Sequence, residues 1–347
     1  MAGQRVPLTT EDVLGEVDEL VAGGELIEAI EVLRRSNREA ADPALEKRLA
    51  QVRYAAFEHL EPGSAFDRWP VPVEGVDTGG PARVPEVTPA ELDADTVRRN
   101  ILSHGSLCVR GLLDDHHVES FIAGIDRALA LRADGPAAGL TRHRDQSWLA
   151  ALPLPRPEAQ SLGRHWVAAS GGILAADTPR LLHQLLETYT DLGLGEVVTE
   201  YLGERPVLSA NKCTFRRVPL TSSTDWHQDG AFLGRGIRAL NIWIALTDCG
   251  VDAPGMDLLP RRLDDIVETG TGGAIFDWAV GPAVVERLAA DSPVVRPEFR
   301  AGDALLFDDL FLHRTAIDPT MTRPRYAIES WFFAPTSYPA GQVPLVW

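Results

Sequence analysis

The side chains of this sequence that are best suited to chemistry are two imidazoles and one carboxylate, which together could bind a metal ion. His227 and Asp229 stand two positions apart in the segment Trp226-His-Gln-Asp229, and His313 follows much later in the chain. On an extended strand, side chains two positions apart point to the same face, so His227 and Asp229 could approach one ion together. Two histidines and one carboxylate on one face of an ion form the ligand set of non-haem Fe(II) oxygenases. The sequence therefore predicts a metal site at His227, Asp229 and His313.

A His-X-Asp segment alone is a weak signal, because a surface histidine beside a capping aspartate gives the same letters. The segments around it strengthen the metal interpretation. The run 238–246 is apolar and rich in β-branched and aromatic residues, which is typical of a strand. The run 299–308 contains a turn at Gly302-Asp303 followed by a buried strand, and this strand would deliver His313. A further strand is predicted at 325–333.

These segments together resemble the phytanoyl-CoA dioxygenase family, a branch of the Fe(II)/2-oxoglutarate oxygenases. The resemblance covers roughly residues 93 to 340, including a predicted opening helix and strand at 96–113. The segments that carry it are WHQD at 226–229, NIWIAL at 241–246, AGDALLF at 301–307, His313, and RYAIESWFF at 325–333. The resemblance implies a mainly β fold with flanking helices (α+β), in which a double-stranded β-helix, a cupin-like jelly roll, forms the core and carries an N-terminal helical appendage.

The resemblance also implies the cofactors, which are Fe(II) and 2-oxoglutarate, with O2 as co-substrate. In the family, an arginine on the strand after the distal histidine holds the far carboxylate of 2-oxoglutarate. Arg325 is the expected residue here, because a guanidinium makes bidentate, charge-assisted bonds to a carboxylate. Arg323 competes for this assignment, and a solvated charge at the strand end is the alternative for Arg325.

Further contacts are expected on the neighbouring strands. Alternation places Asn241 and Trp243 on one face of their strand, opposite the aliphatic face of Ile242, Ile244 and Leu246. A buried amide with internal partners is the alternative reading of Asn241. The predicted cofactor-binding residues besides Arg325 are Asn241, Trp243, Lys212 and Thr214. The predicted substrate contacts are Gln228, Arg216, His143 and Trp148, of which the last two lie in a loop-rich stretch that could cover the site.

The presence of Asp229 bears on the reaction, because related halogenases replace this carboxylate with a small residue. We therefore expect hydroxylation of a small-molecule C–H bond with release of succinate and CO2, in bacterial specialised metabolism. Desaturation, epimerisation or ring formation at the same site would need the same residues. A non-catalytic jelly-roll binding module and a cupin enzyme independent of 2-oxoglutarate are the remaining alternatives, and the second predicts that Arg325 is dispensable.

Composition restricts the partners. The formal net charge of −17 argues against nucleic acid or an anionic membrane as a partner. The three cysteines form no CxxC pair, which suggests a reducing compartment. No signal-peptide pattern is apparent at the start, so the expected location is the cytoplasm.

The chain divides into three parts. Residues 1–61 are expected to form a helical segment, with Thr9 or Thr10 capping a first helix and Asp42-Pro43 starting a third. Residues 62–92 are rich in proline and glycine and predict an extended linker. Residues 93–347 form the predicted oxygenase domain, with its barrel at about 206–334. The N-terminal helices are expected to dock on this domain, or to contact a second copy of the chain or a carrier protein.

Overall fold

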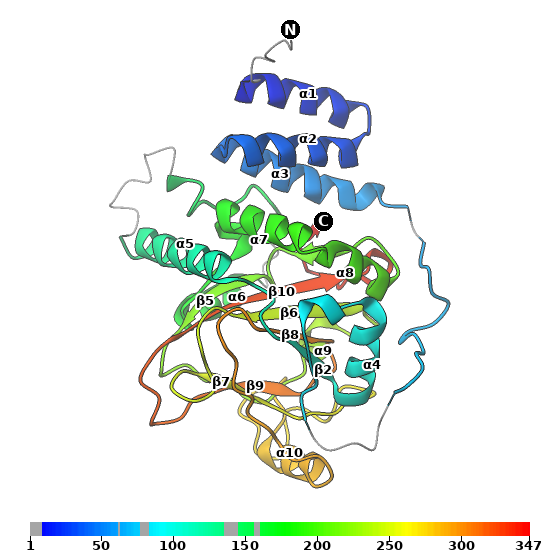
Figure 1. Ribbon diagram of the computed structural model, residues 1–347, viewed down its shortest axis with the longest axis vertical. Helices are drawn as coiled ribbons and strands as arrows, with labels where there is room; N and C mark the ends of the chain where they lie inside the picture. The colour runs from blue at the N-terminus through cyan, green and yellow to red at the C-terminus, as the bar shows by residue number, and fades with distance from the viewer. Residues whose placement is uncertain (1–8, 62, 77–82, 135–144, 156–159) are drawn as a thin grey trace.

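The computed structural model describes residues 9–61, 63–76, 83–134, 145–155 and 160–347. It is a mixed α and β structure with three N-terminal helices and one large mixed sheet (Figure 1). The helices are α1 (Thr10–Ala22), α2 (Leu26–Glu39), α3 (Pro43–Ala56), α4 (Ala94–His104), α5 (Asp115–Asp134), α6 (Gln160–Ala169), α7 (Pro179–Asp191), α8 (Leu194–Leu202), α9 (Gly230–Leu233) and α10 (Pro282–Ala289). The strands are β1 (Glu86–Val87), β2 (Ser106–Val109), β3 (Gly172–Leu174), β4 (Val207–Ser209), β5 (Thr214–Val218), β6 (Ala239–Ala245), β7 (Gly255–Leu258), β8 (Ala304–Phe307), β9 (His313–Ala316), β10 (Arg325–Phe333) and β11 (Pro344–Val346).

The main sheet has nine strands in the order β1-β2-β8-β6-β10-β4-β11, with β5 and β3 continuing from the other end of β10. Four of its strands, β1, β2, β3 and β11, lie outside the predicted barrel limits of 206–334. The main sheet therefore extends beyond the segment in which the sequence predicts the barrel. Of these strands, β2 lies in the predicted helix and strand at 96–113, whereas β1, β3 and β11 have two or three residues each, too few for an alternating pattern to stand out in the sequence.

A small second sheet lies opposite the inner face of the main sheet. It pairs β7 with β9 in antiparallel register, from Gly255 opposite Ala316 to Leu258 opposite His313. Single bridges extend it on both sides, from Leu258 to Val295 and from His313 to His227. The inner face of the main sheet packs on β7 through Trp243, Met256 and Leu258. The segment around His227 is thus held beside the strand that carries His313.

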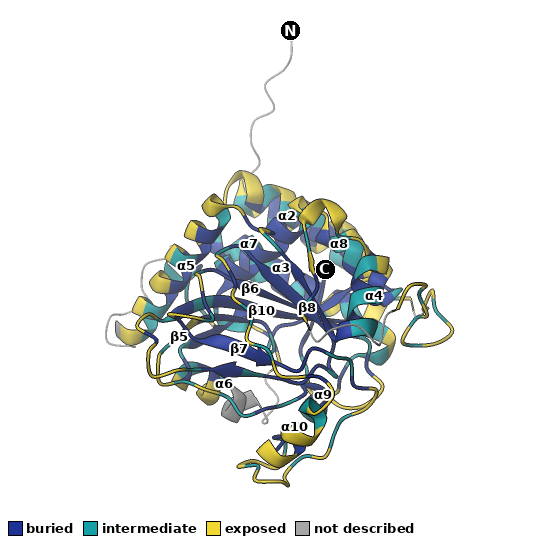
Figure 2. Ribbon diagram, turned by 60° about the horizontal axis from the view of Figure 1, so that its bottom comes forward, coloured by how far each residue is buried: buried dark blue, intermediate teal, exposed yellow. Residues whose placement is uncertain are grey.

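The two faces of the main sheet have different surroundings. Ile242, Ile244 and Ile328 belong to a core that contains side chains of α5, α7 and α8. Trp243 and Trp331 belong to the other core, between the two sheets. Burial in Figure 2 is continuous through both layers, whereas the exposed residues lie on the outer helices and the loops near α9 and α10. The predicted division of the 241–246 run into an aliphatic face and an inner face is confirmed.

The N-terminal helices dock on the rest of the chain. Thr9 caps α1, and Asp42 caps α3 with Pro43 at its first position, as expected from the sequence. Val13, Leu33 and Leu49 share a core with Val207 of β4 and Val346 of β11. Figure 1 shows the three helices stacked as a layer above α7. Within the described residues, no helix is both long and apolar enough to cross a membrane.

Candidate metal centre

The three predicted metal ligands come together between the two sheets. One ligand atom from each of His227, Asp229 and His313 lies within 4.8 Å of the others. The imidazole rings of the two histidines have centroids 4.4 Å apart, and Asp229 Oδ2 lies 3.7 Å from His313 Nε2. Asp229 and His313 are buried, and His227 is partly buried. Residues that lie far apart in the sequence therefore come together as one set of metal-ligating side chains.

The backbone that delivers Asp229 differs from the sequence prediction. His227 has the expected extended pairing, through its bridge to His313. Asp229 has helical backbone angles, φ −61° and ψ −29°, because it caps the short helix α9. Strand alternation therefore does not explain why the His227 and Asp229 side chains meet. The turn into α9 brings the carboxylate to the imidazoles.

Both histidines are oriented for metal binding by their backbone contacts. His227 Nδ1 lies 2.8 Å from the carbonyl oxygen of Asp225, and His313 Nδ1 lies 3.0 Å from that of Phe311. A ring nitrogen that donates to a carbonyl leaves the Nε2 lone pair free to bind a metal. Burial, together with the neighbouring His313, lowers the pKa of His227 to about 4. The imidazole is therefore neutral at neutral pH, which is the form that binds metal.

Lys212 contacts the third ligand directly. Its Nζ lies 3.0 Å from Asp229 Oδ1 and 4.1 Å from the centroid of the Phe232 ring. Burial alone would raise the pKa of Asp229, but Lys212 and the two histidines outweigh it and lower the pKa. The carboxylate is therefore ionised, with Oδ1 held by the ammonium group and Oδ2 directed towards His313.

Arg325 lies at the start of β10 with an incomplete set of partners. Its side chain is 1% exposed, and its Nη1 donates to the carbonyl oxygens of Pro254 and Gly255 at 3.0 and 2.8 Å. Its Nε has no hydrogen-bond partner, and no described carboxylate forms an ion pair with the group. Burial lowers the pKa of this guanidinium to about 10, which leaves it cationic at neutral pH. A buried cation without a counterion fits an anionic ligand.

Arg323, the competing residue, has different surroundings. It is well exposed and lies 3.5 Å from Asp252. Its charge is therefore already balanced at the surface, whereas that of Arg325 is not.

The other predicted cofactor contacts lie on the inner face of the main sheet. Trp243 places its ring 5.3 Å from the Arg325 guanidinium carbon. Asn241 is 1% exposed and its Oδ1 has no hydrogen-bond partner within the chain, which favours a contact to a ligand over the alternative of a buried amide with internal partners. Thr214 donates to Glu329 over 3.4 Å. Lys212, Thr214, Asn241 and Trp243 thus border the same interior as the triad and Arg325.

The predicted substrate contacts are divided. Arg216 is 7% exposed, donates to Ser170 Oγ at 2.8 Å and lies 3.9 Å from Glu329. Gln228 is completely buried, and its amide binds the backbone of Leu310, Asp265 and Val267. The chain itself saturates that amide, so the structure does not support a substrate contact by Gln228, and its observed role is to hold neighbouring backbone segments together.

Of the remaining two candidates, only Trp148 lies within the described residues. Trp148 lies on the helical side of the main sheet, beneath the guanidinium groups of Arg127 and Arg180. This position does not support a substrate contact. His143 lies outside the described residues.

Two inner-face residues were missed by the sequence reasoning. Thr315 stands two positions after His313 on β9, and its partner across the small sheet is Met256, next to the carbonyl that Arg325 binds. Glu329 lies opposite both Thr214 and Trp243 in the main sheet. Alternation along 313–315 and 325–329 is the signal that would have identified both.

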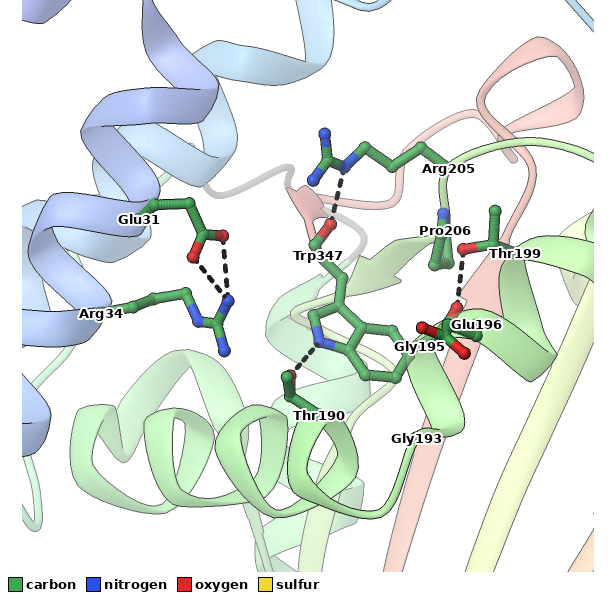
Figure 3. Close-up of a pocket in the computed structure, with 10 residues that line it drawn as sticks. All are labelled: Glu31, Arg34, Thr190, Gly193, Gly195, Glu196, Thr199, Arg205, Pro206 and Trp347. Carbon is green, nitrogen blue, oxygen red and sulfur yellow. Dashed lines mark hydrogen bonds and ion pairs between the residues drawn. The ribbon is translucent and has the colours of Figure 1, made fainter.

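A surface hollow of about 450 Å³ lies away from this centre, between α2 and the ends of α7 and α8. Figure 3 shows that the Arg34 and Glu31 side chains are paired with each other, and that Trp347 lies between Thr190 and Arg205. None of its lining residues belongs to the triad or contacts it. We therefore assign this hollow to the packing of α2 against α7 and α8 and not to the metal centre.

Comparison with known proteins agrees with the geometry. The family model described as phytanoyl-CoA dioxygenase matches residues 101–317, more than half of the chain. No curated protein sequence gives a significant match.

Solved structures give distant matches. The α-ketoglutarate-dependent carbocyclase SnoK from nogalamycin biosynthesis is 17% identical, with a TM-score of 0.46 over 74% of this chain and 88% of that one. The epimerase SnoN from the same biosynthesis is 19% identical, with a TM-score of 0.42 over 70% and 83%. EctD from S. alaskensis is 15% identical, with a TM-score of 0.44 over 74% and 82%.

The donor set also fits the metal that the family uses. Two neutral imidazoles and one carboxylate, without a thiolate, suit Fe(II), and three protein ligands leave positions for other groups. The unpaired guanidinium of Arg325 suits a dicarboxylate beside them. The chain belongs to the phytanoyl-CoA dioxygenase family and is a non-haem iron, 2-oxoglutarate-dependent dioxygenase.

Proposed function

We propose that this enzyme oxidises a C–H bond of a small molecule, most simply by hydroxylation, with release of succinate and CO2. A reaction of bacterial specialised metabolism is the setting that we expected from the sequence. The observation that carries the proposal is the pairing of a buried, neutral donor set with a buried, unpaired Arg325 in one interior. Bound iron and 2-oxoglutarate supply the oxidising power, and the chain supplies position and shielding from water.

We assign the roles as follows. His227, Asp229 and His313 hold Fe(II), while Lys212 holds the second oxygen of Asp229. Arg325 binds the far carboxylate of 2-oxoglutarate, with Thr315 as a hydroxyl donor on the same face as His313. Trp243 supports Arg325 by lying against its guanidinium. The amide of Asn241 and the hydroxyl of Thr214 supply further polar contacts to the cofactor.

The inner face also supplies a polar contact region for the substrate. Arg216 and Glu329 lie 3.9 Å apart, without the short bonds of a closed ion pair. The Nε of Arg216 is buried and has no hydrogen-bond partner. We infer that this pair binds a polar group of the substrate. Hydroxylation, desaturation, epimerisation and ring formation would use the same pair, because they differ in how the substrate lies.

We further propose that the core is a double-stranded β-helix within a domain of residues 93–347. The opposed main and small sheets support this architecture. Residues 1–61 would then be an appended helical segment, and residues 62–92 the linker to it. The apolar side chains of these helices are already packed within the chain, so contact with a second copy or a carrier protein stays a prediction about their outer surfaces.

Anaerobic titration with Fe(II) and 2-oxoglutarate tests the cofactor assignment. A keto acid chelated to iron in a facial triad is expected to give a weak charge-transfer band near ~500 nm. The band should vanish in His313→Ala. In Arg325→Ala the 2-oxoglutarate concentration needed for half-saturation should rise by about 10- to 100-fold, because a charged hydrogen bond is lost.

Arg323→Ala is the matched control, since it removes an arginine only two positions away that is exposed and already paired. It should titrate like the unmodified protein. Bound iron without a band would favour an enzyme independent of 2-oxoglutarate, and failure to bind iron would favour a non-catalytic binding module.

A further inference from the structure

Two of the exposed aromatic side chains, Phe232 and Phe276, contact Trp278 beside the metal centre. Among the described residues, Phe276 is 52% exposed, Trp166 47% and Phe232 44%, and these are the aromatic side chains above about a third. Large aromatic groups normally bury most of their surface, so an exposed cluster of them needs an explanation. Phe232 and Phe276 meet at Trp278, which stands next to His227. We call Phe232, Phe276 and Trp278 the aromatic platform.

The platform runs from the surface to a metal ligand. The rings of Phe276 and Trp278 are parallel within 4°, with centroids 5.2 Å apart. Trp278 meets Phe232 edge-on at 6.1 Å. The centroids of Trp278 and Phe232 lie 5.9 and 6.1 Å from that of His227. A series of ring contacts therefore leads from the exposed Phe276 through Trp278 to the metal ligand His227.

The platform is held in place by the backbone around it. Val280 donates to the carbonyl oxygen of Trp226, the residue before His227, at 2.8 Å. Ala279 and Val280 are buried, and Val280 belongs to a small core with Trp226 and Leu312. Gly281 admits no side chain, since a Cβ there would lie 2.1 Å from the carbonyl oxygen of Thr271. The loop is thus anchored on both the metal-ligand segment and α10, so the rings are positioned before any ligand arrives.

We propose that the aromatic platform binds a flat, apolar ring system of the substrate and so places a neighbouring C–H bond beside the metal centre. This inference rests on the proposed function and names the substrate class for it. Flat rings are favoured because Phe276 and Trp278 already lie parallel, and a third ring can continue that arrangement with offset stacking. The exposed side chain of Ile275, 76% exposed, adds apolar surface at the outer edge.

A small molecule is the occupant that the position favours. Three side chains beside a metal ligand form a patch far smaller than the roughly 1,000 Å² that a specific protein interface needs. A contact between two copies of the chain would not require the aromatic rings to extend to the metal ligand His227. The polar pair of Arg216 and Glu329 remains available for another part of the same molecule.

The test uses 2-naphthol as a flat probe and decahydro-2-naphthol as its saturated counterpart. Both are titrated by calorimetry into the full-length protein loaded anaerobically with Fe(II) and 2-oxoglutarate. The protein should prefer 2-naphthol. Phe276→Ala and Trp278→Leu should each weaken 2-naphthol binding by about fivefold or more, from loss of aromatic stacking. Val251→Ala, which removes an exposed apolar group elsewhere, should bind as the unmodified protein does.

The contrary outcomes are separable. Three outcomes would overturn the platform in a protein that still gives the charge-transfer band. The protein fails to bind 2-naphthol, or Phe276→Ala and Trp278→Leu bind it as tightly as the unmodified protein does, or only Trp166→Ala loses binding. A dimer that dissociates in Phe276→Ala during sedimentation would assign the patch to self-association instead. If the unmodified protein gives no band, the proposed function fails, and this inference fails with it. Circular dichroism checks that each variant is folded.

Discussion

The two faces of β6 differ in whether the chain itself supplies packing and hydrogen-bond partners for their side chains. On the outer face, Leu240, Ile242 and Ile244 are fully buried against side chains of the helical layer. On the inner face, Asn241 has a buried oxygen without a partner, and Trp243 lies against the uncompensated Arg325. The outer face is therefore satisfied by the chain itself, whereas the inner face needs a ligand. Adjacent residues of one strand should then affect different properties, namely stability for one face and binding for the other.

The largest effect is expected at the centre of the inner face. His313→Ala removes one of three iron ligands, so iron affinity and succinate formation should fall by more than about 100-fold, beyond the effect of losing a supporting contact. Iron content after gel filtration and succinate release measure the two losses. His116→Ala, at an exposed histidine, is the control and should retain both. Retention of iron by His313→Ala would show that the triad is assigned wrongly.

The outer face should respond in stability instead. Ile328 is fully buried in the helix-covered core, so Ile328→Ala should lower the free energy of unfolding by about 2–5 kcal/mol. Urea unfolding measures this loss, and the folded variant should still give the charge-transfer band with unchanged 2-oxoglutarate affinity. Ile275→Ala, at an exposed position, should change stability by less than about 0.5 kcal/mol. If Ile328→Ala stays stable but binds 2-oxoglutarate weakly, the division between the faces is wrong.

This division is also where sequence reasoning was strongest. The alternation in 241–246 separated the faces, because this signal depends on local spacing. The triad was identified by residue type together with the resemblance to the phytanoyl-CoA dioxygenase family. The helical backbone at Asp229 was not predictable in this way. It depends on α9 and on the pairing of His227 with His313, which joins distant segments.

Tertiary contacts explain why the structure does not support two other predicted substrate contacts. Gln228 was predicted as a polar neighbour of the ligands, yet the backbone of Leu310, Asp265 and Val267, from two other segments, saturates its amide. Trp148 reads as a loop residue, yet two arginines hold it on the helical side. The aromatic platform could not be predicted from the sequence either, because residues such as Phe276 and Trp278 are equally typical of a buried core.

A smaller effect is expected where the chain supports a ligand without binding iron itself. Lys212→Met frees Oδ1 of Asp229, so the carboxylate can take a second position on the metal that 2-oxoglutarate or O2 requires. The rate of succinate formation should fall by about 10- to 100-fold. Iron affinity should change little, because a repelling positive charge is lost together with the orienting bond.

Lys212→Arg keeps the charge and should recover part of that rate. Comparing iron affinity with turnover in the two variants separates orientation from charge. A large loss of iron in Lys212→Met with no change in turnover per bound iron would contradict the orienting role.

The smallest effect is expected on the helical side, at acid pH. Burial lowers the pKa of His183 on α7 to about 4; Glu187 opposes the shift, and Arg53, Arg180 and Arg34 add to it. The unfolded chain has an ordinary histidine pKa near ~6.5, so between about pH 6.5 and 4 it binds more protons than the folded protein. Stability should therefore fall as the pH is lowered through this range, and the fall should be smaller in His183→Gln. Urea midpoints at pH 7 and pH 5 for both proteins measure the difference. If both proteins lose the same stability between pH 7 and pH 5, groups other than His183 cause the acid sensitivity.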